Sequence, residues 1–226
     1  MHNTKAVLFD FNGVIIDDFL IQKEAWSIVS QKIRGLGVTD SEMYEKIRGV
    51  PSKDTVKRMS EGKLNENEIA EIAKEKDVIT ERLFKESPLF RLANGLETFL
   101  DDMKKKNIPR NIATSSRSRI FRFAYEKLGL VRWFEFEKIV YSDDNIKGKP
   151  APDPYIIAAK KIGVNPEECM VFEDAINGIQ SARSAGVKNI VAVGKDMQLK
   201  VLCRESNVIK GIRDFTEVNV DELFGY

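Results

Sequence analysis

The chain has 226 residues, enough for one large domain or for a domain that carries an insertion. Charged residues make up 31% of it, and 36 Lys and Arg balance 35 Asp and Glu, for a formal net charge of +1. A balanced chain offers no broad electrostatic attraction to nucleic acid or to membrane surfaces. Any anionic ligand must therefore be held by local groups.

The cysteine and histidine content excludes further classes. Two cysteines, Cys169 and Cys203, do not make a disulfide framework, and the single histidine is His2, near the amino terminus. Catalytic triads and metal sites that depend on histidine are therefore not expected. We recognise no signal peptide and no apolar run long enough to span a bilayer. We expect a cytoplasmic protein with no nucleic-acid or membrane partner, and the sequence indicates no protein partner.

The first predicted element is a strand. Ala6–Phe9 is an apolar run typical of a strand buried on both faces, and Asp10, Asn12 and Gly13 follow it. A carboxylate at the end of a buried strand is costly unless a charged group compensates it. In open α/β sheets, ligands bind at this end of the strands. The same residues also fit an ordinary turn, so this stretch alone does not identify a site.

Residues 17–88 differ in character and read as helices without a convincing strand. Apolar residues recur at helical spacing over 24–34, and shorter helices are predicted near 39–49 and 52–59. Asn65 is suited to cap a longer helix after them. This block is predicted to be an all-helical insertion behind the first strand.

From residue 94 onward, helices and strands alternate. The predicted strands cover 111–114, 138–141, 170–172 and 189–193, and the predicted helices cover 96–106, 120–128, a segment beginning near 153, and 176–185. Alternation at this spacing predicts an α/β fold with a parallel sheet that helices cover on both faces.

Polar residues stand at three of the predicted strand ends, and a lysine lies in a loop between two of them. They are Asp10, Thr114 with Ser115, Glu173 with Asp174, and the loop residue Lys149. Because the carboxyl ends of parallel strands share one edge, we expect these groups to converge in one crevice. Carboxylates placed so closely need a hard cation, for which Mg2+ is the natural choice. Such a crevice can receive a phosphoryl group, with Asp10 as the nucleophile.

Each of these elements also has a plainer explanation. Thr114-Ser115-Ser116 and Glu173-Asp174 can be helix caps, and Lys149 can be a surface lysine. Their joint placement at successive strand ends favours a site over three unrelated features.

Together these residues resemble the four motifs of the haloacid dehalogenase (HAD) superfamily. The matching segments are Asp10-Phe-Asn-Gly-Val14, the strand-end Thr114, Lys149-Pro-Ala-Pro-Asp153 and Glu173-Asp174. Phe172–Ile179 and Arg48-Gly49-Val50 extend the resemblance to the β-phosphoglucomutase-like branch. The resemblance covers nearly the whole chain. It implies a Rossmann-like, doubly wound core of residues 1–16 and 89–226 with an inserted α-helical cap at residues 17–88.

The resemblance also implies a chemistry, that of a Mg2+-dependent phosphatase acting on a small, sugar-phosphate-like metabolite. It implies an aspartyl phosphate on Asp10, with the phosphoryl oxygens held by Lys149, Thr114 and the backbone of Ser115. The metal ligands that it implies are Asp10, the backbone carbonyl of Asn12, Glu173 and Asp174.

Three positions depart from the family pattern. Phosphate-transferring members normally have a second Asp at the position of Asn12, where its carboxyl is the general acid and base, and Asn cannot exchange a proton. Gln22 stands where the sugar-phosphate mutases have His, and Ser52 where they have a phosphate-binding Arg. Arg48 or Lys53 can supply phosphate-binding charge from the cap, but not the bidentate geometry of the missing Arg. A β-phosphoglucomutase-type mutase is therefore less expected than a phosphatase.

Asn12 also supports a second hypothesis, a catalytically impaired relative, natural or engineered, that binds phosphorylated ligands without turning them over. Dehalogenases and phosphonate-cleaving enzymes lack the second Asp as well. Dehalogenases need no metal, so Glu173-Asp174 argues against that class. A phosphonate-cleaving enzyme needs a Schiff-base lysine in the cap, and Lys53 is displaced by one residue from the expected place. The sequence identifies neither the substrate nor the oligomeric state.

Overall fold

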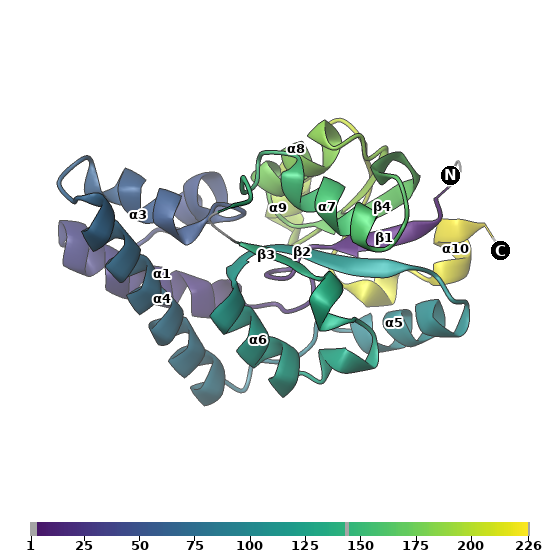
Figure 1. Ribbon diagram of the computed structural model, residues 1–226, viewed down its shortest axis with the longest axis horizontal. Coiled ribbons are helices and arrows are strands. Elements are labelled where there is room, and N and C mark those ends of the chain that lie inside the picture. The colour runs from purple at the N-terminus through teal and green to yellow at the C-terminus, as the bar shows by residue number, and fades with distance from the viewer. Residues whose placement is uncertain (1–3, 143–144, 226) are drawn as a thin grey trace.

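The computed structural model describes residues 4–142 and 145–225, so His2 lies outside the described residues. Its centre is a six-stranded parallel sheet in the order β3-β2-β1-β4-β5-β6 (Figure 1). The strands are β1 (Ala6–Phe9), β2 (Arg110–Arg117), β3 (Val140–Ser142), β4 (Cys169–Glu173), β5 (Asn189–Val193) and β6 (Val208–Ile212).

The strand order shows where the chain changes direction within the sheet. The chain runs outward from β1 to β3 on one side and from β4 to β6 on the other, so β1 and β4 are neighbours at the centre. In doubly wound sheets, this switch point opens a crevice at the carboxyl ends of the strands. The predicted α/β fold with a doubly wound parallel sheet is confirmed.

Helices cover both faces of the sheet. They are α5 (Leu96–Lys105), α6 (Ser118–Lys127), α7 (Asp153–Lys161), α8 (Ile176–Ser184), α9 (Asp196–Leu202) and α10 (Val220–Phe224), with 3-10 turns at Leu130–Arg132, Phe136–Lys138, Pro166–Glu168 and Phe215–Glu217. Val7 and Phe9 belong to the apolar cluster under α5, α6 and α10, whereas Ala6 and Leu8 belong to the cluster under α7, α8 and α9. This alternation explains the continuous apolar run of β1, since a strand covered on both faces buries every side chain. Within the described residues, no helix combines the length and apolar character needed to cross a membrane.

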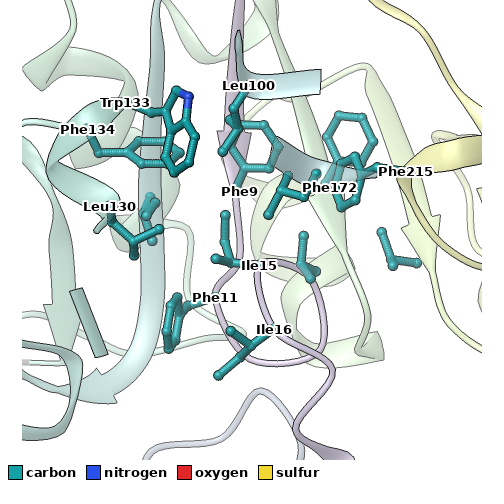
Figure 2. Close-up of a cluster of buried hydrophobic side chains, with 14 of the residues drawn as sticks. Phe9, Phe11, Ile15, Ile16, Leu100, Leu130, Trp133, Phe134, Phe172 and Phe215 are labelled. Carbon is teal, nitrogen blue, oxygen red and sulfur yellow. The ribbon is translucent and has the colours of Figure 1, made fainter. Parts of the chain in front are cut away.

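Aromatic side chains pack directly beneath the carboxyl ends of β1 and β4 (Figure 2). Phe9 and Phe172 are register partners on the two strands, with ring centroids 5.3 Å apart. Phe215 lies 6.2 Å from Phe9 and 5.1 Å from Phe172, and Phe134 lies 6.0 Å from Phe9. Each such pair adds about 0.5–1.5 kcal/mol beyond the burial of area. The cluster therefore holds the ends of β1 and β4 in place. Asp10 directly follows β1, and Glu173 is the last residue of β4.

The segment between β1 and α5 is helical, as predicted, and it contributes no strand to the sheet. It contains α1 (Phe19–Arg34), α2 (Asp40–Glu42), a π-helical turn (Met43–Ile47), α3 (Ser52–Ser60) and α4 (Glu66–Glu86). These helices share an apolar cluster of their own, and in Figure 1 α1, α3 and α4 lie to the left of the sheet. The predicted cap Asn65 accepts hydrogen bonds from the backbone N–H groups of Asn67 and Glu68.

Several boundaries differ from those predicted. β2 extends beyond 111–114 at both ends, and β3 starts two residues late because Phe136–Lys138 forms a 3-10 turn. β6 was not predicted. It is an edge strand in which the apolar pattern is broken by Lys210 and Gly211, so its sequence lacks the signal of a buried strand.

The chain turns sharply at Gly13 between β1 and the insertion. Gly13 has φ of 80°, and its N–H donates to the Ile16 carbonyl at 2.7 Å. Ile16 then forms an antiparallel bridge with Leu92, so the entry to the insertion and the exit from it run side by side. A Cβ atom at Gly13 would lie 1.9 Å from Asp174 Oδ2. Both the positive φ and the close approach therefore require glycine here.

A pair of substitutions separates these two requirements. Gly13→Ala and Gly62→Ala introduce the same backbone strain, because φ is 80° at Gly13 and 79° at Gly62, but the Cβ position at Gly62 has no atom within 4 Å. We expect Gly62→Ala to lower the free energy of unfolding by about 1–2 kcal/mol. Gly13→Ala should lower it by about 1–3 kcal/mol more, because of overpacking. Urea unfolding of both variants measures the difference, and equal losses would contradict the role given to the contact with Asp174.

Candidate active site

A buried lysine joins the ends of β1 and β4. Lys149 Nζ donates hydrogen bonds to Asp10 Oδ1 and to Glu173 Oε1, both at 2.6 Å, and to the Tyr155 hydroxyl at 3.1 Å. The Lys149 side chain is 0% exposed, so these groups replace the water that would otherwise stabilise its charge. The structure thus brings together three residues that the sequence predicted at one edge of the sheet.

Burial and charge have opposing effects on these groups. Burial raises the pKa of Asp10 to about 7, and the attraction of Lys149 limits that increase. Burial also lowers the pKa of Lys149, but the charges of Asp10 and Glu173 outweigh it, so the pKa of this lysine is raised overall. Lys149 therefore remains an ammonium group beside Asp10.

Glu173 is held by donors on both carboxylate oxygens. Its Oε2 accepts hydrogen bonds from the backbone N–H groups of Asp174 at 2.8 Å and Ala175 at 3.0 Å. Its Oε1 accepts from the Tyr155 hydroxyl at 2.8 Å, in addition to the lysine. Sequence reasoning missed Tyr155, whose one signal was its place at the start of the helix that follows the lysine loop. Glu173 has little freedom to move, and it orients the groups around it.

The acidic residues at the two strand ends form a compact cluster. One oxygen each of Asp10, Glu173 and Asp174 lies within 4.8 Å of the others, and all three residues are buried. Arg48 forms an ion pair with Asp174 from the insertion side. Three carboxylates thus share two cations, Lys149 and Arg48, so the fully ionised cluster carries one excess negative charge in a buried space. A converging set of hard oxygen donors with excess negative charge can hold a divalent cation.

The Asn12 side chain bridges the core and the insertion in a defined orientation. Its Nδ2 donates to Asp18 Oδ2 at 2.6 Å, and its Oδ1 accepts from Ser116 Oγ at 2.6 Å. An ionised carboxylate only accepts hydrogen bonds, so the amide nitrogen is assigned to the side that faces Asp18. Burial raises the pKa of Asp18, and hydrogen bonds from Gln22 and Asn12 oppose the increase. No role was predicted for Asp18 from the sequence.

The two predicted phosphate-binding residues of β2 differ in accessibility. Ser115 lines the cavity above the strand ends, and its Oγ donates to the Gly49 carbonyl of the insertion at 3.3 Å. Thr114 is buried, and its Oγ1 accepts from the Ser116 N–H at 3.0 Å, which stabilises the bend of the chain at the end of β2. Ser115 is therefore better placed than Thr114 to contact a ligand.

A cavity of about 80 Å³ lies between the strand ends and the insertion. From the core it is lined by Asp10, Asn12, Ser115, Ser116, Ile120 and Asp174, and from the insertion by Asp18, Phe19, Gln22, Trp26, Met43, Ile47, Arg48, Gly49, Val50, Ser52, Lys76, Asp77 and Thr80. Its charged groups therefore come from both parts of the chain.

The two predicted cap cations occupy different places. Arg48 lines the cavity, and its guanidinium lies 5.6 Å from the ring centroid of Phe19 and 5.4 Å from that of Tyr44. Lys53 instead lines a neighbouring hollow together with Arg117 and other residues. The structure thus brings Arg48, and not Lys53, to the cavity that holds Asp10.

The wall formed by α1 and α4 carries polar groups to which sequence reasoning gave no role. Gln22 Nε2 donates to Asp18 Oδ2 at 2.7 Å, and Lys76 Nζ donates to Gln22 Oε1 at 2.6 Å. Lys76 is buried, and its Nζ lies 5.0 Å from the centroid of a Trp26 ring. A continuous hydrogen-bonded row therefore runs from Asn12 along the insertion to Lys76. Helical periodicity cannot reveal such a row, because it joins residues from two helices and a loop.

Comparisons with known proteins agree with this geometry. The family model described as haloacid dehalogenase-like hydrolase matches residues 7–192. The chain is 30% identical over 193 residues to a phosphorylated carbohydrates phosphatase of Thermotoga maritima, covering 84% of this chain and 85% of that protein. It is also 30% identical over 190 residues to the β-phosphoglucomutase of Bacillus subtilis, covering 81% of this chain and 80% of that protein.

Among solved structures, the chain is similar to a HAD hydrolase of family IA, variant 3, from Entamoeba histolytica. The TM-score is 0.88 at 32% identity, with 98% of each chain covered. The family match covers most of the sequence and spans the ends of β1, β2 and β4, which carry the site, together with Lys149. This chain therefore belongs to the haloacid dehalogenase-like hydrolase family, and it resembles the β-phosphoglucomutase-like members.

Proposed function

We propose that this protein is a Mg2+-dependent phosphatase. Its proposed substrate is a small phosphorylated metabolite of the sugar-phosphate type. The observation that carries the proposal is the Asp10 carboxylate, which is bonded to buried Lys149 and faces the cavity. Relatives named as phosphatases of phosphorylated carbohydrates and of hexitols support the substrate class.

In the proposed reaction, Asp10 attacks phosphorus with the carboxylate oxygen that Lys149 does not hold. A bond forms between Asp10 and phosphorus while the ester bond breaks, and the departing oxygen takes a proton from water, because Asn12 cannot supply one. Lys149 and Ser115 then face the phosphoryl oxygens. Water hydrolyses the resulting acyl phosphate, which releases phosphate and restores Asp10.

The carboxylate cluster is the proposed site of Mg2+. Asp10, Asp174 and the backbone carbonyl of Asn12 would hold the ion directly. Both oxygens of Glu173 already accept hydrogen bonds, so Glu173 would help to hold the ion indirectly. When bound, Mg2+ supplies shielding of the negative charge on the phosphoryl group.

Removal of Asp174 tests the metal assignment. Mg2+ at about 100 times its Kd should stabilise the unmodified chain by about 2.7 kcal/mol, seen as a higher Tm in a thermal melt. Asp174→Ala should abolish this response, because it removes a direct ligand. Asp102→Ala on α5, where the side chain is 43% exposed, is the control and should keep the response. A full Mg2+ response in Asp174→Ala would reject the assignment.

A second candidate function is a binding protein that holds phosphorylated ligands without turnover. Asn12 supports it, since a carboxamide cannot protonate the departing oxygen or activate water. Asn12 leaves Asp10 and Lys149 in place, so the attack remains possible. We expect Asn12 to slow the proton-transfer steps. A mutase and a phosphonate-cleaving enzyme have less support, because Gln22 is engaged with Asp18 and Lys76, and Lys53 lies in the neighbouring hollow.

Asn12→Asp separates the two candidates. We expect it to raise the turnover of a sugar phosphate at least about tenfold, a cautious value for proton transfer. The gain on an acyl phosphate should be smaller, because that leaving group needs little protonation. Steady-state rates in a broad screen of phosphorylated metabolites measure both gains.

Asp18 complicates this variant, since a carboxylate at position 12 would lie about as close to Asp18 as Nδ2 does now, at 2.6 Å. Asn12→Asp/Asp18→Asn keeps one carboxylate and one carboxamide in contact, so it controls for loss of folding through repulsion. If both variants fold, bind Mg2+ and turn over no metabolite, the binding-protein candidate prevails. If the unmodified chain is already rapid on sugar phosphates, the role given to position 12 is wrong.

We further propose that residues 17–88 form a cap domain that moves against a core of residues 1–16 and 89–226. An apolar cluster formed by the insertion alone supports this division, although Ile21, Ala25, Leu83 and Phe84 of the insertion pack into the cluster of the core.

Long hydrogen bonds join a loop of the insertion to the core, from Ser115 Oγ to the Gly49 carbonyl at 3.3 Å and from Asn177 Nδ2 to the Arg48 carbonyl at 3.2 Å. Other polar links are ion pairs, of Arg48 with Asp174, Arg117 with Asp77 and Arg119 with Glu81, which can break and re-form as a domain opens and closes.

Solution scattering tests the motion of this cap. The radius of gyration should fall when Mg2+ and a phosphate mimic are added together, because the ligand bridges cap and core. Mg2+ alone is the control. Identical scattering curves in the presence and absence of the mimic would argue against a moving cap.

A further inference from the structure

Asp18 occupies a position where a structural role is expected but absent. It is the N-cap residue of α1, and Asp is among the preferred residues there, because its carboxylate accepts from the first N–H groups of the helix. Asp18 makes no such side-chain bond. Its buried carboxylate turns instead into the cavity that holds Asp10. Asp18 therefore lacks the usual stabilising contact with its own helix, and its carboxylate faces the cavity instead.

The groups around Asp18 leave one of its oxygens available. Asn12 Nδ2 and Gln22 Nε2 both donate to Oδ2, at 2.6 and 2.7 Å. No hydrogen bond to Oδ1 is found among the described residues. The amide oxygens of Asn12 and Gln22 are already bonded to Ser116 and Lys76. On this part of the wall, Asp18 Oδ1 is therefore the acceptor left for a ligand.

The charges beside Asp18 define what this oxygen can accept. Arg48 and Lys76 are both near enough to attract its charge, and Gln22 bridges Asp18 and Lys76. A neutral hydroxyl can donate to Asp18 without electrostatic penalty. A second carboxylate or phosphate group at the same place would meet a buried like charge, and a purely aliphatic group would leave the oxygen without a partner.

We infer that Asp18 is a specificity residue that accepts a hydrogen bond from a hydroxyl of the organic part of the substrate. The selected substrates are phosphate monoesters of neutral, hydroxyl-bearing molecules such as polyols and sugars, and esters with a carboxylate in that position are rejected. This inference rests on the proposed function, because it places the phosphoryl group at Asp10 and the organic part against α1 and α4. A hydrogen bond to a charged group gives discrimination of about tenfold or more.

The test compares the binding of three probes by calorimetry in the presence of Mg2+: glycerol 3-phosphate, n-propyl phosphate and phosphoglycolate. The unmodified chain should bind glycerol 3-phosphate at least about tenfold more tightly than n-propyl phosphate. In Asp18→Ala this ratio should fall below about threefold, and phosphoglycolate should bind more tightly than before. A general loss of structure would weaken all three probes, so the change in their order is the diagnostic readout.

Asp17→Ala is the matched control, because Asp17 is the exposed neighbour of Asp18, and it should keep the original ratio. If Asp18→Ala does not fold, Asp18→Asn should show a smaller change in the same direction, since Asn12 and Gln22 then compete with the hydroxyl for one amide oxygen. A ratio near one in the unmodified chain, or an unchanged ratio in a folded Asp18 variant, overturns the inference. Turnover is measured separately: absence of turnover counts against the proposed phosphatase, whereas the binding ratios decide the role of Asp18.

Discussion

The site depends on the compensation of charges that are removed from water. Lys149 is fully buried between Asp10 and Glu173 and donates a hydrogen bond to each carboxylate. The aromatic cluster of Phe9 and Phe172 packs beneath these groups, and the lysine offsets the cost of burying two carboxylates. Truncation of a buried ion pair on one side typically costs about 3–5 kcal/mol, because the remaining charge is left without a partner. The same lysine that donates to Asp10 therefore also stabilises the packing of the strand ends.

The insertion contributes a cation to this buried cluster, and it also covers the cavity. Arg48 reaches Asp174 from the insertion, and the glycine turn at Gly13 leaves room for both side chains. The backbone carbonyls of Arg48 and Gly49 accept hydrogen bonds from Asn177 and Ser115 of the core. Movement of this loop would change the charge that Asp174 faces. Closure of the proposed cap and the affinity of the proposed metal site are therefore physically coupled.

The sequence was most informative where a single physical cause determined the local pattern. Ala6–Phe9 and Asn189–Val193 matched their predicted bounds, because strands buried on both faces need uninterrupted apolar runs. The convergence of Asp10, Lys149 and Glu173 followed from parallel topology, which places the carboxyl ends of strands on one edge. The edge strand Val208–Ile212 escaped prediction, since its half-exposed residues carry no such pattern. The assignment of Asp10 as nucleophile and of the metal ligands stays a prediction.

The cavity wall was harder to predict because its residues meet only in three dimensions. Asp18, Gln22 and Lys76 lie on two helices whose sequences show ordinary helical spacing, and nothing local indicates that these side chains join in one row. Lys53 shows a different difficulty. It was predicted, as an alternative to Arg48, to supply phosphate-binding charge in place of the Arg missing at Ser52, but it lines the neighbouring hollow. Charge and sequence proximity alone cannot place a side chain in a cavity.

The identity of residue 12 is best understood together with that of residue 18. A carboxamide at position 12 and a carboxylate at position 18 form a matched donor and acceptor at 2.6 Å. Two carboxylates in the same place would repel unless they shared a proton, and two carboxamides would remove the charge that faces Lys76. A second Asp at position 12, the usual residue of phosphate-transferring relatives, is therefore poorly compatible with Asp18. The two positions constrain each other, so Asn12 by itself is a weak argument that this chain has lost its chemistry.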